Sequence, residues 1–211
     1  MSLEVVTLIQ EPLQTNTYLI ADTTTQTAAV IDPSFEGQVV LDEASRRGWT
    51  LHQIWLTHGH FDHIAGTSLV ANAFKPPLLV GLHPADMELW AQSGGAEYFG
   101  FKIETGPEPT IMFYQGQILN LGQLKFLVRH TPGHTRGHVI FYCPEAHTLF
   151  CGDLLFKNGI GRTDMPGGSF LELKRSIRMQ VMTLADDIRL LPGHGEETTV
   201  GVEKKNNPYL K

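Results

Sequence analysis

Short runs rich in apolar residues recur from the start of the chain, separated by polar stretches. Four of them lie within the first 57 residues: EVVTLI, TYLIAD, TAAVIDP and LHQIWLT. Their length, and the Thr, Pro and Gly residues between them, are typical of β-strands joined by turns. Between the third and the fourth run, EGQVVLDEASRRGW predicts a helix, with Val39, Val40 and Ala44 on its apolar face and Gly48 as its C-terminal cap.

The rest of the chain repeats this pattern with longer helical stretches. After the motif LTHGHFDHIAG, the segments HIAGTSLVANAF and HPADMELWAQ predict helices on either side of a strand, LLVGL. Residues 93–110 are rich in glycine and predict an irregular stretch, and four strands follow at QILNLG, LKFLVRH, HVIFYC and HTLFCGD. SFLELKRSIRMQVMTL then predicts a helix with Ser169 as N-cap and Glu172 completing a capping box. A last strand, DIRLLPGHG, and a short helix end the pattern.

The predicted order of elements consists of two runs of strands, each followed by helices. It lacks the regular strand–helix–strand alternation of a parallel sheet, so we expect an α/β fold with two sheets stacked face to face and helices outside. No linker or low-complexity stretch divides the sequence. Residues 1–211 are therefore expected to form a single domain.

Composition and charge narrow the class of protein. The 211 residues are 42% hydrophobic and 18% charged, as in globular enzymes rather than disordered chains. The net charge of −6 and the lack of a Lys/Arg stripe argue against a nucleic-acid partner. No apolar run approaches the roughly 20 residues that span a bilayer, and no secretory signal is visible, so no membrane association is expected. Cys143 and Cys151 are too few for a disulfide framework, which predicts a cytoplasmic protein with free thiols.

The stretch LTHGHFDHIAG contains three of the ten histidines, His58, His60 and His63, together with Asp62. Alternate residues of an extended chain point the same way, so His58 and His60 can share one metal ion. Asp62 and His63 are adjacent and point differently, which allows them to serve a second ion. Solvated or packing histidines are the alternative, but three imidazoles beside a carboxylate suit a metal better than a core.

Three further potential ligands each follow a predicted strand. His134 lies in the turn TPGH, Asp153 ends LFCGD, and His194 lies in LLPGHG. Pro-Gly turns fix the backbone, and strand ends on a rigid scaffold commonly carry functional side chains. The sequence therefore predicts a metal site built from distant parts of the chain.

These motifs resemble those of the metallo-β-lactamase-fold hydrolases through nearly the whole chain. Within that superfamily, THGHFDHIAG, TPGHTRGH, GDLLFKNGIGRTDMPGG and LPGHG look most like glyoxalase II-type thioesterases, in particular the short bacterial hydroxyacylglutathione hydrolases. The resemblance implies an αββα sandwich, in which two stacked mixed β-sheets are flanked by helices. It places the site at one edge of the two sheets.

The resemblance also implies a role for each ligand. One metal would be held by His58, His60 and His134. A second would be held by Asp62, His63 and His194, with Asp153 bridging the two. The expected cofactors are two divalent metal ions, with Zn²⁺ as the first choice and Fe²⁺ or Mn²⁺ compatible with the same imidazole and carboxylate donors.

The implied activity is hydrolysis of a small-molecule thioester such as S-D-lactoylglutathione. Two cations about 3.5–4 Å apart hold a shared water and lower its pKa, and the bridging hydroxide would attack the carbonyl while Asp62 orients it. A thiolate leaves without a general acid, since free thiols have a pKa of about 8.5. A lactam nitrogen would need such an acid, and the sequence offers no clear candidate. The protein is expected to act as a monomer or a homodimer.

The sequence departs from the glyoxalase II pattern where glutathione would bind. Classical enzymes have an additional C-terminal helical domain for glutathione, whereas only about fifteen residues follow LPGHG here. A lysine and a tyrosine that contact glutathione in those enzymes are replaced by Arg162 and Asp164. Arg162 either meets a substrate carboxylate or forms an ion pair with Asp164. Tyr98, Phe99 and Phe101, in the irregular stretch, either cover the substrate or serve core packing or a dimer contact, and packing or a dimer contact is favoured.

A persulfide dioxygenase is the alternative function. Those relatives share the fold, the first histidine cluster and the string GRTD, and they hold a single iron at positions matching His58, His134 and Asp153. In that family Phe-Gln follows GRTD, whereas MPGG follows it here, which favours the thioesterase. An RNA-processing nuclease of the same fold would carry a basic exosite, and none is visible in the sequence.

Overall fold

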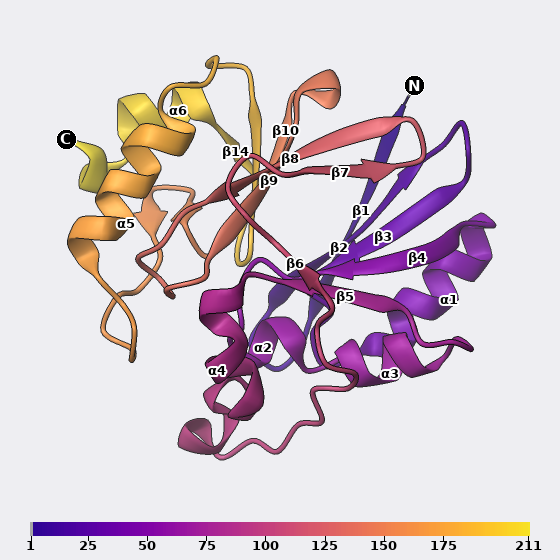
Figure 1. Cartoon of the computed structure of the whole chain (residues 1–211). Helices are drawn as coiled ribbons and strands as arrows, with labels where there is room; N and C mark the ends of the chain where they lie inside the picture. Colours follow the sequence, from indigo (N-terminus) through magenta and orange to yellow (C-terminus); the bar gives the residue numbers. More distant parts are fainter. Residues whose placement is uncertain (1) are drawn as a thin grey trace.

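Strands of the first half form one mixed sheet in the computed structural model, which describes residues 2–211 (Figure 1). They lie in the order of the sequence: β1 (Leu3–Gln10), β2 (Thr15–Asp22), β3 (Thr27–Ile31), β4 (Thr50–Trp55), β5 (Leu79–Leu82) and β6 (Ile111–Met112). β1, β2 and β3 pair antiparallel, and β3 to β6 pair parallel. Every residue of β2 is buried, because both faces of this strand are covered.

The second half forms another mixed sheet and a small hairpin. The order across this sheet is β14 (Thr198–Thr199), β13 (Arg189–Pro192), β10 (Thr148–Gly152), β9 (Val139–Cys143), β8 (Leu124–His130) and β7 (Ile118–Leu121). β10 and β13 pair parallel, and the other neighbours pair antiparallel. β11 (Leu155–Phe156) and β12 (Gly159–Ile160) pair only with each other among the described residues.

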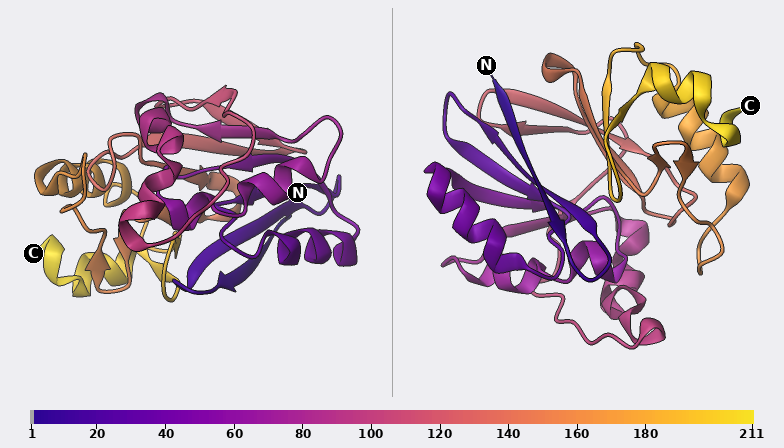
Figure 2. Two further views of the ribbon diagram at one scale, coloured as in Figure 1. Left: turned by 90° about the horizontal axis from the view of Figure 1, so that it is seen from below. Right: turned by 180° about the vertical axis from the view of Figure 1, so that it is seen from behind.

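Helices cover the outer faces of the two sheets (Figure 2). The first sheet carries α1 (Gly37–Arg47), α2 (Phe61–Ile64), α3 (Thr67–Asn72) and α4 (Met87–Ala91), and the second carries α5 (Phe170–Ser176) and α6 (Val200–Asn206). Further helical segments that are not α-helical lie at Pro84–Asp86, Ser93–Phe99, Pro144–Ala146, Ile177–Val181 and Pro208–Leu210. Within residues 2–211, none of these helices has the length and apolar content needed to cross a bilayer.

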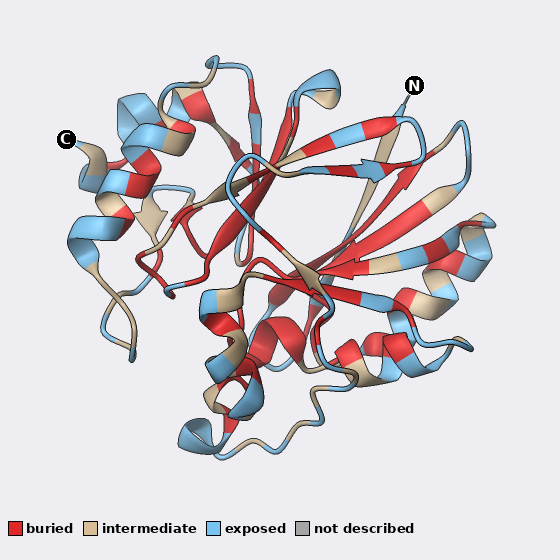
Figure 3. Cartoon of the chain, in the orientation of Figure 1, coloured by how far each residue is buried: buried red, intermediate tan, exposed pale blue. Residues whose placement is uncertain are grey.

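Three apolar clusters separate the four layers. Val40 and Ile54 belong to the cluster between α1, α3 and the first sheet. Aromatic rings, including those of Trp55 and Phe141, fill the space between the two sheets. Leu173 belongs to the third cluster, between the second sheet and α5. Central strands such as β2, β9 and β10 are buried along most of their length, whereas the edge strands β1 and β7 are more exposed (Figure 3). The expected αββα arrangement is confirmed.

Two of the predicted helix ends are present, whereas one predicted helix is divided. Gly48 ends α1 in the left-handed conformation with φ 70°, and Ser169 Oγ accepts a hydrogen bond from the Glu172 N–H at the start of α5. The predicted capping box is only half formed, because the Ser169 N–H donates to the carbonyl of Gly133 and not to the Glu172 side chain. The helix expected over HIAGTSLVANAF forms α2 and α3 instead, with Gly66 between them. The N–H of Gly66 donates to the carbonyl of Pro33 rather than within a helix. A Cβ at Gly66 would lie 2.0 Å from the carbonyl oxygen of Ser34, so only glycine allows this close approach.

Candidate metal centre

Each predicted ligand lies just beyond the carboxyl end of a strand. The first four follow β4, in the loop that enters α2 and in α2 itself; His134 follows β8, Asp153 follows β10 and His194 follows β13. β8 and β10 are both antiparallel to β9, and β13 is parallel to β10, so these three strands end at the same edge of the second sheet. The edge of one sheet thereby faces the edge of the other across the predicted site.

The donor atoms of His58, His60 and His134 converge. The Nε2 atom of His134 lies 3.2 Å from Nε2 of His58 and 2.8 Å from Nδ1 of His60. All three side chains are buried. One ligand atom from each lies within 4.8 Å of the others, a spacing at which three donors can hold one ion.

Hydrogen bonds on the far side of two of these rings show which nitrogen carries the lone pair. His134 Nδ1 donates to the main-chain carbonyl of Arg162 at 2.8 Å. His58 Nδ1 lies 2.9 Å from Thr57 Oγ1, whose own proton goes to Asp32 Oδ2 at 2.6 Å, so Nδ1 of His58 is the donor. The Nε2 atoms of His58 and His134 therefore present lone pairs to each other. A cation between them relieves the repulsion, which means that this group fits a metal ion.

Asp62, His63 and His194 form a second group, and Asp153 lies between the two groups. Nε2 of His194 is 3.2 Å from Asp62 Oδ2, and Nε2 of His63 is 3.5 Å from the same oxygen. Asp153 Oδ2 is 3.6 Å from His134 Nε2 and 3.7 Å from His194 Nε2. One carboxylate is thus adjacent to donors from both groups.

The second group also fits a cation. His63 Nδ1 donates to Asp32 Oδ2 at 2.9 Å, so Nε2 is the ring nitrogen that faces the second group. Across residues 2–211, no hydrogen-bond partner is found for the buried His63 Nε2 or for the buried Asp153 Oδ1. These two atoms lie 3.4 Å apart. Buried polar atoms almost always have a partner, and a divalent cation supplies one to both.

Burial and charge favour neutral imidazoles in the first group. Burial lowers the pKa of His58 far below its ordinary value, and His63 and His134 lower it further. Burial, followed by His134, lowers the pKa of His60 to about 3. Only a neutral ring offers a lone pair to a metal, so these two side chains are ready to bind one at neutral pH.

The second group instead attracts positive charge. Burial tends to raise the pKa of Asp153, but His63, His134 and His194 hold it far below its usual range. Burial tends to lower the pKa of His63, yet Asp62, Asp153 and Asp32 together raise it well above the ordinary value. The carboxylates therefore favour a positive charge at His63 Nε2, where a metal ion would also lie.

His138 and Asn16 fix the backbone of two ligands. His138 is buried, and its Nε2 accepts a hydrogen bond from the Asp153 N–H at 3.1 Å. The side-chain amide of Asn16 donates to the carbonyls of Pro192 and Gly195, at 2.9 and 2.8 Å. Because these carbonyls flank His194, Asn16 in β2 attaches the turn from the second sheet to the first.

Asp86 joins the two loops that carry the first group. Its buried carboxylate accepts hydrogen bonds from the Gly59 N–H at 3.0 Å, the Thr135 hydroxyl at 2.7 Å and the Gly137 N–H at 2.6 Å. Burial raises the pKa of Asp86, and these hydrogen bonds oppose the increase without cancelling it. Gly59 lies between His58 and His60, so a single carboxylate sets the distance between ligands from both sheets.

Comparison with known protein families shows which family this chain belongs to. Residues 11–194 match the metallo-β-lactamase superfamily. The chain belongs to that superfamily. A relative from Haemophilus influenzae, named hydroxyacylglutathione hydrolase GloC, is 35% identical over 198 residues, which cover 87% of each protein. The match to the superfamily includes all seven predicted ligands and ends at His194.

Solved structures of the metallo-β-lactamase superfamily share the fold of the whole chain. BLEG-1 B3 metallo-β-lactamase has a TM-score of 0.92 at 32% identity, covering 99% of this chain and 100% of its own. TTHA1623 in a di-iron-bound form has a TM-score of 0.89 at 36% identity, covering 98% and 100%. ETHE1 from Myxococcus xanthus has a TM-score of 0.80 at 27% identity, covering 97% and 83%. The superfamily and fold expected from the motifs are confirmed.

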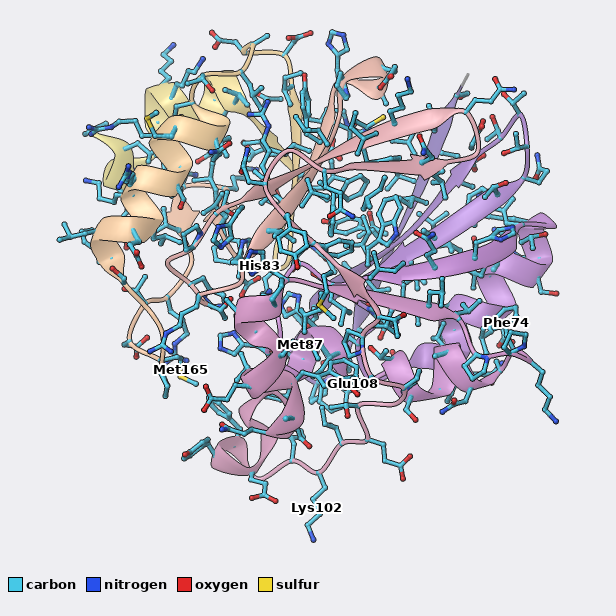
Figure 4. All side chains as sticks on the ribbon, viewed as in Figure 1. Phe74, His83, Met87, Lys102, Glu108 and Met165 are labelled. Atoms are coloured by element: carbon cyan, nitrogen blue, oxygen red, sulfur yellow. The ribbon has the colours of Figure 1, made fainter. Side chains whose placement is uncertain are left out.

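The metallo-β-lactamase fold places a cavity of about 440 Å³ over the ligands. The loop after β12 forms one side of this cavity and carries Arg162 and Met165. Figure 4 shows the Met165 side chain at the far end of this loop. Both oxygens of Asp164 accept from the Arg162 guanidinium, each at 2.8 Å, so the predicted ion pair forms while Arg162 still lines the cavity. Phe99 also lines the cavity and is 45% exposed.

Several residues that support this superfamily site were not predicted from the sequence, among them Asp32 and Asp86. Asp32 supports both groups, and the sequence held a signal for it, since Asp32 follows TAAVI just as Asp153 follows its own strand. Asp86 had no such signal, because it lies in a helical turn and its partners are distant along the chain. His83 and His130 were not predicted ligands, and their rings stack on each other with centroids 4.1 Å apart, outside both groups. Figure 4 labels His83.

Proposed function

We propose that this metallo-hydrolase binds two divalent metal ions and hydrolyses a thioester. The observation that carries the proposal is the position of Asp153, whose carboxylate lies beside donors of both groups. In this proposal His58, His60 and His134 hold one ion, and Asp62, His63 and His194 hold the other. Asp153 bridges them. A site for one ion would leave the second group of donors without a role.

Two ions held in this way supply a polarised carbonyl and a water of lowered pKa. The protein's own contribution is orientation. Asp62 Oδ2 lies 3.2 Å from His194 Nε2 and accepts a hydrogen bond from Thr15 Oγ1 at 3.3 Å. These contacts fix a carboxylate at the cavity floor, where it would orient the attacking hydroxide. Zn²⁺ is the first expectation for the metal, and a di-iron neighbour keeps Fe²⁺ in consideration.

The leaving group favours a thioester over an amide or a lactam. A thiolate departs without protonation near neutral pH, because free thiols have a pKa of about 8.5. The described residues that line the cavity include no lysine, tyrosine or cysteine to protonate a leaving nitrogen. The name of the Haemophilus influenzae relative makes S-D-lactoylglutathione the first substrate to test. Arg162 lines the cavity, but its guanidinium is paired with Asp164, so a substrate carboxylate would have to displace that ion pair.

The test combines metal analysis with three assays of the purified chain. Elemental content is measured first, followed by thiol release from S-D-lactoylglutathione, oxygen consumption with glutathione persulfide, and hydrolysis of a β-lactam. Two metals per chain with saturable thiol release support the proposal. One iron with oxygen consumption and no thiol release would replace it with a persulfide dioxygenase. Lactam hydrolysis that exceeds thioester hydrolysis would make the chain a lactamase.

A further inference from the structure

The walls of the cavity over the metal ligands are apolar. Six side chains form them: Leu13, Phe61, Phe99, Phe156, Ile160 and Met165. They come from both halves of the chain and surround the ligand atoms on the floor. A cavity of about 440 Å³ lies within the usual range for a small-molecule site.

The aromatic part of this wall is held rigidly. The ring of Phe61 stacks on Phe99 and on Phe101, each at 5.2 Å between centroids, and Phe35 meets Phe61 edge-on at 6.2 Å. Phe61 also begins α2, directly between His60 and Asp62. The apolar surface is therefore attached to the ligands themselves, and a substrate at the metals must contact it.

The same wall offers little to a charged substrate. Arg162 is the one cation among the described residues that line the cavity, and Asp164 occupies two of its nitrogens. Leu13 and Phe99 are 40% and 45% exposed, so apolar surface is accessible at the mouth. A tripeptide thiol with two carboxylates and an ammonium group would lose water there and gain few charged partners.

We infer that the preferred substrate is a thioester with an uncharged, apolar group next to the scissile bond, and that these six side chains bind this group. The inference rests on the proposed thioesterase activity and narrows its substrate class. The apolar group is either the acyl chain or the thiol portion, since both flank the carbonyl that is attacked. Hydrolysis adds water across the C–S bond and releases the carboxylate and the thiol.

The experiment uses the metal-loaded chain and two series of thioesters. One series varies the acyl group from acetyl to butyryl and hexanoyl on N-acetylcysteamine, an uncharged thiol. The other keeps acetyl and varies the thiol from methyl to hexyl. We expect kcat/KM to rise about fourfold for each methylene that enters the cavity, in one series or the other. S-D-lactoylglutathione should be hydrolysed less efficiently than the best member.

Binding without chemistry separates the two proposals. S-methyl- and S-hexyl-N-acetylcysteamine, which cannot be hydrolysed, are titrated into the same protein by calorimetry. If hydrolysis occurs but kcat/KM does not change with chain length in either series, the preference for an apolar substrate is refuted and the thioesterase activity stands. Tighter binding of the hexyl compound without any hydrolysis would overturn the thioesterase and leave the apolar pocket. Neither binding nor hydrolysis would overturn both.

Matched variants test whether the dependence of kcat/KM on chain length comes from the apolar side chains of the cavity wall. Phe99→Ala should lower kcat/KM for the longest good substrate by about tenfold and for the acetyl ester by less than about twofold. Tyr98→Ala is the control, because Tyr98 is 84% exposed and lies outside the cavity lining. Met165→Gln keeps the size of the side chain but makes it polar. It should reduce the dependence of kcat/KM on the chain length of the substrate without disturbing the stacking of Phe61. Equal effects of Phe99→Ala and Tyr98→Ala, with no effect of Met165→Gln, would contradict the assignment.

Discussion

The Nδ1–H of His134 donates to the main-chain carbonyl of Arg162 across 2.8 Å. The loop that forms one side of the cavity thus also sets the orientation of an imidazole on its floor. Because the bond uses the backbone of Arg162, the side chain of this residue is free to vary without loss of the metal site. Binding of metal and choice of substrate are therefore separable at this position.

Arg162→Ala should keep the metal content of the wild-type protein and change KM for a glutathione thioester by less than about threefold, because its guanidinium is already paired with Asp164 in an exposed ion pair. Asp164→Asn should have the larger effect, since it frees the guanidinium and should lower KM for substrates that carry carboxylates. Steady-state kinetics with S-D-lactoylglutathione measure both. A large increase in KM in Arg162→Ala alone would show that Arg162 binds the substrate despite Asp164.

Asp153→Asn should reduce metal content below two ions per chain and reduce turnover at least about 100-fold, because a neutral amide cannot bridge two cations. Metal analysis after dialysis and an activity assay with added metal measure the two effects. Asp187→Asn is the matched control, since Asp187 is an exposed carboxylate that contacts His147 away from the site. Full turnover with normal metal content in Asp153→Asn would refute the bridging assignment.

Asp32→Asn should weaken metal binding at both groups by about 10- to 100-fold, the usual effect of losing an outer hydrogen-bond partner. The reason is that Asp32 accepts from His63 and also from Thr57, which supports His58. Thr57→Val should weaken the first group alone, since His63 keeps its bond to Asp32. Competition with a chromophoric chelator resolves the two affinities. Equal profiles for the two variants would show that Asp32 acts through Thr57 only.

Asp86→Ala should lower the free energy of unfolding by about 3 kcal/mol, because it leaves three buried donors without an acceptor. It should also weaken the first metal group, since the loops that carry His60 and His134 are no longer joined. Urea unfolding with and without a chelator separates the two effects. If the free energy of unfolding falls by the same amount with and without metal, Asp86 contributes to folding and not to metal binding.

Cys143 should react slowly with iodoacetamide in the folded protein. Burial raises the pKa of the Cys143 thiol to about 11. At pH 8 its thiolate fraction is then roughly 200-fold below that of a free thiol with a pKa of about 8.5. The rate should rise about tenfold per pH unit up to pH 11, whereas a free thiol levels off above about 8.5. Mass spectrometry of timed samples follows the reaction, and a plateau near pH 8.5 would show an exposed thiol.

The sequence predicted the layers and the ligands for the same physical reason. Apolar runs of strand length indicated the sheets, and polar residues placed directly after those runs, such as Asp153 and His194, indicated the edge where the strands end. The division of a helix at Gly66 was not predictable, because it depends on contact with Ser34, which is distant along the chain. The role of Asp86 was hidden likewise, since its partners Gly59 and Gly137 are neighbours only after folding.

The two groups of donors also differ in when they become complete. A ribosome makes the chain from its N-terminus, so the three imidazoles of the first group all exist once His134 has been added. The second group must wait for His194, where the superfamily match ends. Asn16, made early, then receives the late turn through two hydrogen bonds. The candidate site is therefore complete only after β13, one of the last strands of the second sheet to be made, has placed His194 beside the other donors.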